Sequence, residues 1–283
     1  MIKQIGEKLK QNAQRITIGL GLALIFLCHS LGVIQIPALN KLDNYIYDAR
    51  LRMTAPGGID ERIVILDIDE KSLAEVGRWP WSRNKLAELT TRLFDHYRIK
   101  VLGFDVVFTE RDQSSGLSSL DSIAKGTLKN DSTFQQTLKS IRGSLDYDQQ
   151  FADSLDGRPV VLGYTFNREA KNGALPAPVL PAGTFEGKDV RVDSYSGYSG
   201  NLPELFSAST LAGHFNPHTD PDGIYRRVPM LVEHDGKYYE ALSLAMVRVL
   251  LGKPQIIPGY PVDNSQASSS YSRVEWLDLP TQQ

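Results

Sequence analysis

The chain has 283 residues, of which 41% are hydrophobic and 23% charged, a composition typical of a folded globular protein rather than a disordered one. Its formal net charge is −2, so the charge balance gives no indication of nucleic-acid binding, which requires a basic surface. Cys28 is the single cysteine, which excludes a disulfide within the folded domain. No cofactor is predicted.

A long apolar segment near the N-terminus predicts a membrane span. The segment Ile16–Ile36 holds 21 residues without a formal charge, and a helix of this length is about 30 Å long, the thickness of the hydrocarbon core. Four Lys and Arg residues against one Glu precede it, so the tail is expected to stay in the cytoplasm. We predict a cytoplasmic tail over 1–15, a transmembrane helix over 16–36 and an extracytoplasmic domain over 37–283, in the inner (plasma) membrane of a bacterium.

Three other interpretations of this segment are open, and one of them, a buried core helix, would rarely be this long without a charge. A cleaved signal peptide has the same order of charge and apolarity, but its apolar core is shorter and ends in a small-x-small site that is not evident here. Lipoprotein processing at Cys28 requires small residues where Phe26 and Leu27 stand. An uncleaved single-pass anchor is therefore the prediction. Gly19 and Ala23, four residues apart, could let two such helices pack closely.

Hydrophobic periodicity after Pro37 predicts an α/β fold with a mixed, partly parallel sheet and flanking helices. In chain order the expected elements are a helix over 39–53, a buried strand over 62–68, a helix capped by Ser82 and reaching 97, a buried strand over 101–108, a polar excursion with short helices over 110–144, a helix over 151–155, a strand over 159–166, a loop over 184–200, a hairpin over 224–232 and 237–240, a helix over 241–251, and a polar, irregular end over 253–283. The strands over 62–68 and 101–108 flank a helix, so they form a βαβ unit and are expected to be parallel.

An ordered set of motifs identifies the family that the sequence resembles. The motifs, in chain order, are DARLR (Asp48–Arg52), IVILDIDEKSL (Ile63–Leu73), GRWPWSR (Gly77–Arg83), FDVVFTE (Phe104–Glu110), VVLGY (Val160–Tyr164), GHFNPHTDPDGIYRRVPML (Gly213–Leu231) and SLAMV (Ser243–Val247). Together they resemble the second CHASE family, the type-two extracellular sensory domain associated with cyclases and histidine kinases. The resemblance covers about 200 residues, and it depends on the order of the whole set rather than on any one motif.

The resemblance implies a receptor input domain. Its departures are Ser82, where the family usually has proline, and Arg111, where a proline often follows Glu110. Family members normally continue into another strand, further membrane helices and a cytoplasmic output domain. We therefore expect the sensory domain to be truncated at its C-terminal end, with the output enzyme (an adenylate or guanylate cyclase, a histidine kinase, a Ser/Thr kinase or a diguanylate cyclase) not on this chain. No enzymatic activity is predicted for the chain itself.

A phosphatase is the alternative enzymatic interpretation. Asp67 and Asp69 follow an apolar run at the expected end of a strand, as do the nucleophile and acid/base pair of metal-dependent haloacid-dehalogenase-type phosphatases. That family usually follows the pair with Thr or Val, whereas Glu70 and Lys71 stand here, and no later Lys or acidic-pair motif is evident. A third alternative is a scaffold that binds another envelope protein, which an exposed apolar patch would favour.

Charged and aromatic residues at the expected carboxyl edge of the sheet are the candidates for ligand binding. An open α/β sheet places its sites at this edge. The candidate ligand-binding residues are Asp67, Asp69, Arg78, Trp79, Trp81, Arg83, Asp105 and Glu110. The alternative is structural: the carboxylates pair with arginine or cap helices, and the two tryptophans cover the core. The ligand itself is an unidentified small molecule or envelope component, and a homodimer is expected.

His214, His218, Asp220 and Asp222 lie close enough in sequence to be considered as metal ligands. Their spacing matches no established site, prolines interrupt the segment, and Asp222-Gly223 is a turn signal before a strand. No metal is therefore predicted. Arg226 and Arg227 follow the turn on opposite faces of the expected strand, so one of them is expected to pair with the acidic turn and the other to face solvent.

Overall fold

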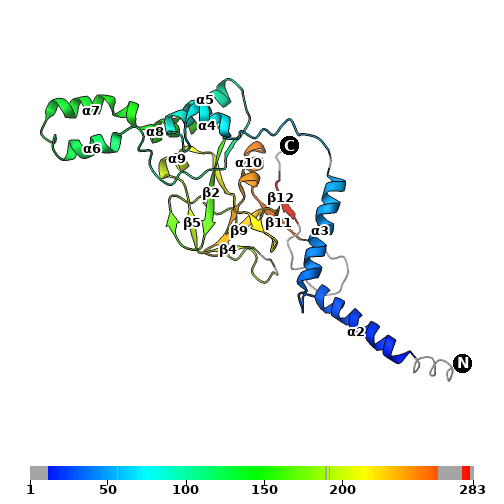
Figure 1. The fold of residues 1–283 in the computed structure, drawn as a ribbon. Helices are drawn as coiled ribbons and strands as arrows, with labels where there is room; N and C mark the ends of the chain where they lie inside the picture. Colours follow the sequence, from blue (N-terminus) through cyan, green and yellow to red (C-terminus); the bar gives the residue numbers. More distant parts are fainter. Residues whose placement is uncertain (1–11, 56, 189, 191, 261–275, 281–283) are drawn as a thin grey trace. The chain divides into compact units, whose positions relative to one another are not determined.

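The structure is a computed structural model that describes residues 12–55, 57–188, 190, 192–260 and 276–280 of the chain. It has two compact units, Met1–Asp67 and Ile68–Gln283. Unit 1 is helical, and unit 2 combines helices with mixed β-sheets (Figure 1). The predicted α/β class with one apolar N-terminal helix is confirmed.

Unit 1 contains two helices of similar length, α2 (Ala13–Ser30) and α3 (Pro37–Thr54). Among the described residues, α2 is the helix that is long and apolar enough to cross a membrane, and none of it is buried within the structure. Its 18 residues give a length of about 27 Å, close to the hydrocarbon thickness. The helix predicted over 39–53 is confirmed by α3.

The end of α2 differs from the predicted span, since Leu31–Ile36 is not helical. Gly32 adopts φ +72°, a left-handed conformation that commonly ends helices and that glycine tolerates best. The Ile36 N–H then donates to His29 Nδ1 at 3.3 Å, and Pro37 opens the next helix. Polar and conformationally special residues therefore stop the helix before the apolar sequence ends.

The prediction of a strand over 62–68 is wrong, because this segment has no regular secondary structure. The side chains of its apolar run, Ile63, Val64, Ile65 and Leu66, are 70%, 82%, 87% and 58% exposed. No strand of the described residues pairs with it. The βαβ unit expected to begin here is therefore not formed, although its helix and second strand are present.

The centre of unit 2 is a parallel arrangement in which β2 (Val160–Asn167) lies between β1 (Leu102–Phe104) and β6 (Leu211–His214). The other end of β2 pairs with β5 (Gly197–Ser199) in antiparallel orientation, and β3 (Lys171–Asn172) pairs with β5. The predicted strand over 159–166 is confirmed. The strand predicted over 101–108 is shorter than expected, and the predicted loop over 184–200 contains two short strands.

Helices cover both faces of this sheet. The helices of unit 2 are α4 (Glu70–Val76), α5 (Arg83–Asp95), α6 (Leu117–Lys125), α7 (Ser132–Leu145), α8 (Tyr147–Leu155), α9 (Pro203–Ala208) and α10 (Leu242–Leu250). On one face Leu162 and Tyr164 belong to a core cluster with side chains of α5, α8 and α9. On the other face α10 packs so closely that a Cβ on Gly213 would collide with the Leu242 backbone. Adjacent strand residues point to opposite faces, so β2 is buried on both.

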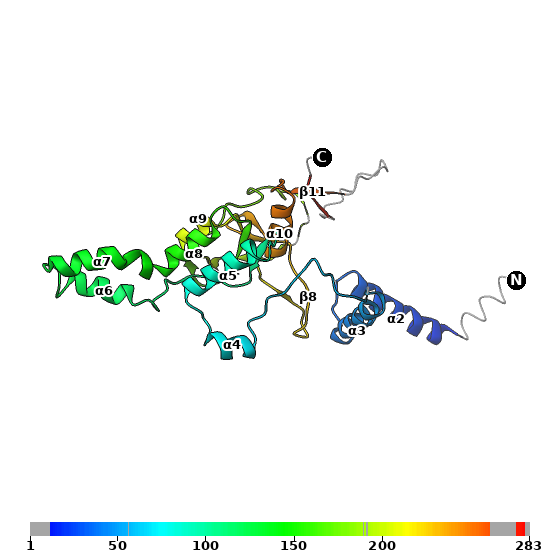
Figure 2. The same cartoon turned by 90° about the horizontal axis from the view of Figure 1, so that it is seen from above.

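The polar excursion predicted over 110–144 contains the helical hairpin of α6 and α7, which projects beyond the sheet in Figures 1 and 2. Leu138 is the buried residue of this hairpin. A bidentate pair between Arg142 and Asp121, with distances of 2.6 and 2.8 Å, joins the two helices. The hairpin is therefore held by few apolar contacts.

The remaining strands form small sheets. They are β9 (Leu231–His234) with β10 (Lys237–Glu240) and β4 (Ser194–Tyr195), β7 (His218–Thr219) with β8 (Tyr225–Arg227), and β11 (Ile257–Gly259) with β12 (Trp276–Asp278). The hairpin of β9 and β10 is confirmed, but its first strand begins at 231 rather than 224. The sequence predicts an irregular segment over 253–283, but this segment contains β11 and β12. Residues 261–275 and 281–283 lie outside the described residues. The final helix prediction is confirmed by α10.

Truncation of Phe151 is expected to destabilise unit 2 strongly. Its ring is fully buried and makes edge contacts with Phe104 and Phe108, at centroid distances of 5.6 and 5.2 Å. The Phe151→Ala change should lower the free energy of unfolding by about 3–5 kcal/mol, since it removes apolar burial and leaves a cavity. Denaturant unfolding of the detergent-solubilised chain measures this, and a loss below about 1 kcal/mol would contradict the described core.

Candidate functional site

The two acids of the phosphatase alternative do not form a pair in the structure. Asp67 is exposed in the irregular segment that ends unit 1. Asp69 is the N-cap of α4, and its Oδ1 accepts hydrogen bonds from the Ser72 N–H at 2.8 Å and the Ser72 hydroxyl at 2.7 Å. These bonds lower the pKa of Asp69. Asp69 therefore performs the helix-capping role given by the structural alternative.

The loop before α5 contains the predicted arginine and tryptophans. Trp81 packs against the core cluster, and its Nε1 donates to the Gly77 carbonyl at 2.8 Å. Trp79 is 37% exposed and contacts the Trp81 ring edge-on, with centroids 5.8 Å apart. Arg78 is exposed beside them. Trp81 covers the core, and Arg78 and Trp79 face solvent.

Arg83 is the predicted site residue with the most contacts. It is the first residue of α5, and its side chain is 11% exposed. Its guanidinium lies over the Phe108 ring at 4.4 Å from the centroid, and its Nε is 3.6 Å from Asp148 Oδ1. Its Nη2 donates to the Glu110 carbonyl at 3.4 Å, which brings two of the candidate residues together through the backbone of Glu110. The Arg83 guanidinium is thus enclosed by a ring, a carboxylate and a carbonyl.

Two aspartates that the sequence analysis did not single out complete this cluster. Asp112 Oδ2 accepts from the backbone N–H of Arg83 at 2.6 Å and so caps α5. Ser82 occupies the predicted cap position, but its hydroxyl donates to Asn84 instead. Asp148 Oδ2 in turn accepts from the Asp112 N–H at 3.0 Å. The cluster therefore joins the start of α5 to the chain after β1 and to α8.

Burial and hydrogen bonding shift the two carboxyl groups in opposite directions. Burial raises the pKa of Asp148, opposed by the Asp112 N–H and the Arg83 charge. Burial also acts on Asp112, but bonds from Ser114 and from the Arg83 N–H lower the pKa of Asp112 overall. Burial lowers the pKa of Arg83, opposed by both acids. These are the shifts of a buried ion pair with a structural role.

The remaining acids of the predicted set lie on the surface. Asp105 follows β1 and is exposed, and the side chain of Glu110 is exposed as well. The strand ladder expected to bring Asp67 beside Asp105 is not formed among the described residues. Of the eight candidate ligand-binding residues, the structure therefore brings Arg83 to the backbone of Glu110 and Trp79 to Trp81.

The acidic turn after β7 pairs with both arginines that follow it. Asp220, 5% exposed, accepts from Arg226 Nη1 at 3.0 Å and from Arg227 Nη1 at 3.2 Å. Arg226 also contacts Asp222 at 2.8 Å, and its side chain is 4% exposed. Arg226 thus pairs with the acidic turn as expected, and Arg227 is 58% exposed but also pairs with Asp220, which was not expected. Arginine holds this turn together.

The two histidines considered as metal ligands are in different environments. His214 is fully buried in β6, whereas His218 is exposed in β7 and its Nδ1 lies 3.1 Å from Asp193 Oδ2. Within the described ranges, no three His, Cys, Asp or Glu side chains are grouped so that they could hold a metal ion. Asp220 and Asp222 bind arginine in this arrangement.

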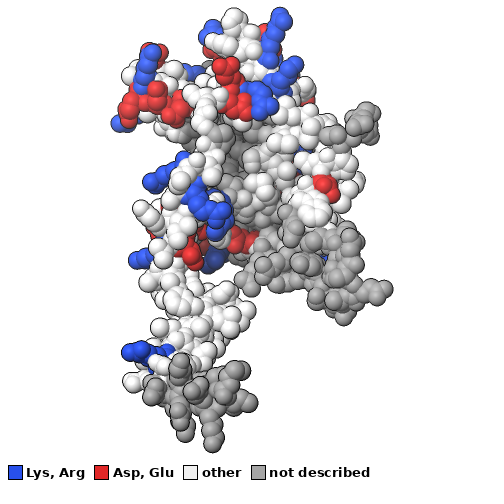
Figure 3. Space-filling model, turned by 90° about the vertical axis from the view of Figure 1, so that its right-hand side faces the viewer, with Lys and Arg blue, Asp and Glu red and all other residues white. Residues whose placement is uncertain are grey.

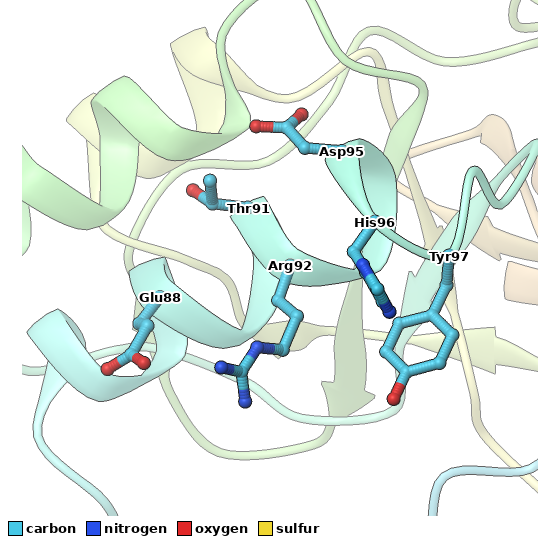
Figure 4. A pocket seen from close by; sticks show the side chains of 6 residues that line it. All are labelled: Glu88, Thr91, Arg92, Asp95, His96 and Tyr97. Carbon is cyan, nitrogen blue, oxygen red and sulfur yellow. The ribbon is translucent and has the colours of Figure 1, made fainter.

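A shallow hollow of about 450 Å³ lies along α5, lined by Glu88, Thr91, Arg92, Asp95, His96 and Tyr97. Figure 4 shows Thr91 and Asp95 on one side of the helix and Arg92 and His96 on the other. Asp95 is engaged with Arg158 at 3.0 Å. The side chains of a specific ligand site converge on one point. Those that line this hollow do not (Figure 4).

Buried asparagines are structural residues that the sequence analysis missed. Asn201 is fully buried, accepts from the Phe108 N–H at 2.8 Å and donates to the Gly163 carbonyl at 2.9 Å. Asn216 bonds both the N–H and the carbonyl of Phe166, each at 2.8 Å. Both asparagine side chains thus supply hydrogen-bond partners to backbone groups of β2 or of Phe108, as a neighbouring strand would. Asn-Leu-Pro and Asn-Pro resemble ordinary turn signals, so sequence gives no indication of these bonds.

Breaking the Arg83–Asp148 pair from one side is expected to be costly. Arg83→Met leaves a buried carboxylate without its counter-charge, so the free energy of unfolding should fall by about 3–5 kcal/mol. The loss should shrink as pH falls, because a carboxyl with a raised pKa destabilises the fold less once protonated. Arg83→Met combined with Asp148→Leu should recover most of the loss.

Denaturant unfolding at several pH values measures these changes. The matched control is Arg111→Met, since Arg111 is 67% exposed and pairs with Glu204 at the surface. This control should change stability by less than about 1 kcal/mol. Equal effects of the two arginine changes would contradict a structural role for Arg83.

The fold and its charged clusters define a class of protein: an α/β domain, following one apolar helix, whose described ion pairs and caps hold secondary structure together. The family model described as CHASE2 domain matches residues 20–283, essentially the whole chain, and the chain belongs to this family. CHASE2 is a sensory extracellular domain of signalling receptors and is not catalytic. No curated protein and no solved structure matches the chain.

Proposed function

We propose that this chain is the extracytoplasmic input domain, with its membrane anchor, of a bacterial transmembrane receptor. The single observation that carries the proposal is the CHASE2 match over residues 20–283, which begins within α2. The output, a cyclase, histidine kinase, Ser/Thr kinase or diguanylate cyclase, would lie outside these residues. The receptor as a whole would then be an enzyme regulated by a domain that only senses.

The surface of α2 supports its role as the anchor. The helix carries one formal charge, Arg15 near its start, and the face of this segment seen in Figure 3 is otherwise free of Lys, Arg, Asp and Glu. Its large apolar side chains are exposed, for example Leu20 at 66% and Leu24 at 59%. Water is an unfavourable solvent for such a surface, and lipid is a favourable one. The basic tail before it favours an orientation with the N-terminus in the cytoplasm.

Self-association through α3 is a further part of the proposal. Leu42, Tyr45, Ile46 and Met53 recur at helical spacing and are 52%, 72%, 46% and 84% exposed. An exposed apolar stripe on a helix that follows a membrane span suits a parallel contact with a second copy. In a homodimer, a shift of one α3 against the other would carry a signal toward the membrane.

For the stimulus we keep the proposal made from sequence. An unidentified small molecule or envelope component would bind the charged and aromatic residues before α5. Arg78 and Trp79 support this because they present a cation and an indole to solvent on one loop. Arginine and tryptophan are common anchors in recognition sites. Arg83 and Trp81 would support this loop from below rather than contact the ligand.

Fusion of alkaline phosphatase, which is active only outside the cytoplasm, to Gln283 tests the proposed topology in bacterial cells. The fusion should be active, and a green fluorescent protein fused at the same position should be dark. A matched variant, Leu24→Arg, places a charge within α2, weakens insertion and should reduce phosphatase activity. If the phosphatase fusion of the parent chain is inactive and its green fluorescent protein fusion is fluorescent, the proposal is contradicted.

Ile46→Glu is expected to weaken the dimer, because it places charge within the apolar stripe of α3. The measurement is the molar mass of the detergent-solubilised chain by size-exclusion chromatography with light scattering. Asn40→Glu, on the opposite side of the helix, is the control and should leave the mass unchanged. A monomeric parent chain, or equal effects of the two variants, would contradict the α3 contact.

A further inference from the structure

Unit 2 contains a group of buried polar side chains that the clusters described above do not use. Tyr164, His214 and Glu240 are 1%, 0% and 3% exposed. Tyr164 and His214 are directly paired in the β2–β6 ladder, and Glu240 precedes Ala241, which bridges to His214. Residues paired in a parallel ladder point to the same face, so Tyr164 and His214 share a face, whereas Glu240 comes from β10, one residue before the bridge to His214.

Several polar atoms of this group have no hydrogen-bond partner among the residues that the structure describes. They are the Tyr164 hydroxyl, both ring nitrogens of His214 and Glu240 Oε2. Native proteins pair nearly all buried polar atoms, so an accumulation of unpaired ones is uncommon and calls for a functional explanation. Tyr164 lies on the central strand β2, and all three side chains are almost completely buried, where unpaired polar atoms are most unfavourable.

The other oxygen of Glu240 belongs to an ion pair that ties three segments together. Arg248 Nη1 donates to Glu240 Oε1, and the side chains are 12% and 3% exposed. The Arg248 Nε donates to the Pro254 carbonyl at 2.8 Å. Because Arg248 lies in the last turn of α10, one guanidinium joins β10, the end of α10 and the segment that leads to β11.

Glu240 is the member of this group whose charge changes near neutral pH. Burial raises the pKa of Glu240 to about 7, opposed by Arg248. Burial lowers the pKa of His214 to about 4, so its ring is neutral above that value. Burial and the Glu240 charge hold the pKa of the Tyr164 hydroxyl well above its usual value. Tyr239, beside Glu240 on β10, also has a raised pKa, and Arg248 is the cation from α10.

We propose that the buried Glu240–Arg248 pair is a proton-binding site through which external pH controls how firmly α10 and the segment after it are held. This inference rests on the proposed function only in assigning the pH to the outside of the cell. The proton comes from solvent and converts the Glu240 carboxylate to the neutral acid.

The direction of the response follows from linkage. A carboxyl buried as here binds a proton at about pH 7, whereas the same carboxyl in water binds it at its ordinary value of 4.5. The proton therefore binds the packed arrangement more tightly than one in which Glu240 reaches water, and it stabilises the packing. As pH rises through 7 this advantage is lost, and the end of α10 opens more often. His214 stays in the ladder with Tyr164, so this local opening leaves it buried.

Hydrogen–deuterium exchange of the full chain in lipid nanodiscs at pH 6 and 8, corrected for intrinsic rates, tests the proposal. Between these pH values the opening equilibrium of segment 242–256 should rise about tenfold, while β2 stays protected. Glu240→Gln, neutral at every pH, should remove this dependence. The matched control is the exposed Glu169→Gln, which should retain it.

Infrared difference spectra between the same pH values provide a second readout that does not depend on how far the segment opens. The carbonyl band of a protonated carboxylic acid should titrate near pH 7 in the parent chain and be missing in Glu240→Gln. If the band is absent from the parent, or if the exchange of Glu240→Gln depends on pH as the parent does, the proposal is overturned. The topology experiment can fail or succeed independently of both results.

Discussion

The burial of β2 on both faces is the constraint on which unit 2 depends. Val160, Val161 and Leu162 are fully buried, and every backbone polar group along such a strand needs a partner because water cannot reach it. Parallel ladders to β1 and β6 supply most of these partners. Where the ladders end, Asn201 and Asn216 donate and accept in their place. The helices are then packed on the two faces by the side chains that alternate along this strand.

The buried charges of unit 2, like its buried backbone groups, each have a partner. Arg83, Arg226 and Arg248 are each largely buried, and each is held against carboxylates. Arginine suits this role because its planar group can satisfy several acceptors at once and keeps its charge. The three clusters differ in what they join: a helix start, a turn, and a helix end. The third differs further because its carboxylate has a raised pKa, which makes the packing around α10 responsive to protons.

The elements that sequence predicted well are those whose side chains repeat on one face. The stripes of α3, α5 and α10 and the apolar run of β2 specify these elements locally, and the structure contains them. The run over 62–68 has equally strong strand propensity and forms no strand, since propensity does not supply the neighbour that a strand requires. For the same reason the pocket expected from Asp67 beside Asp105 does not follow from their positions. Arg83 was found because of its motif, whereas Asp112 and Asp148 lie in a polar stretch where nothing local distinguishes them.

The proposed arrangement is a sensory domain that stands outside the cell on one membrane helix. Labelling of intact cells with a membrane-impermeant maleimide tests it most directly, because Cys28 is the single native cysteine and can be replaced by serine. In that background Glu169→Cys places one thiol on the surface of unit 2. Labelling before lysis is the predicted result. Labelling that requires lysis would place unit 2 in the cytoplasm and contradict the account.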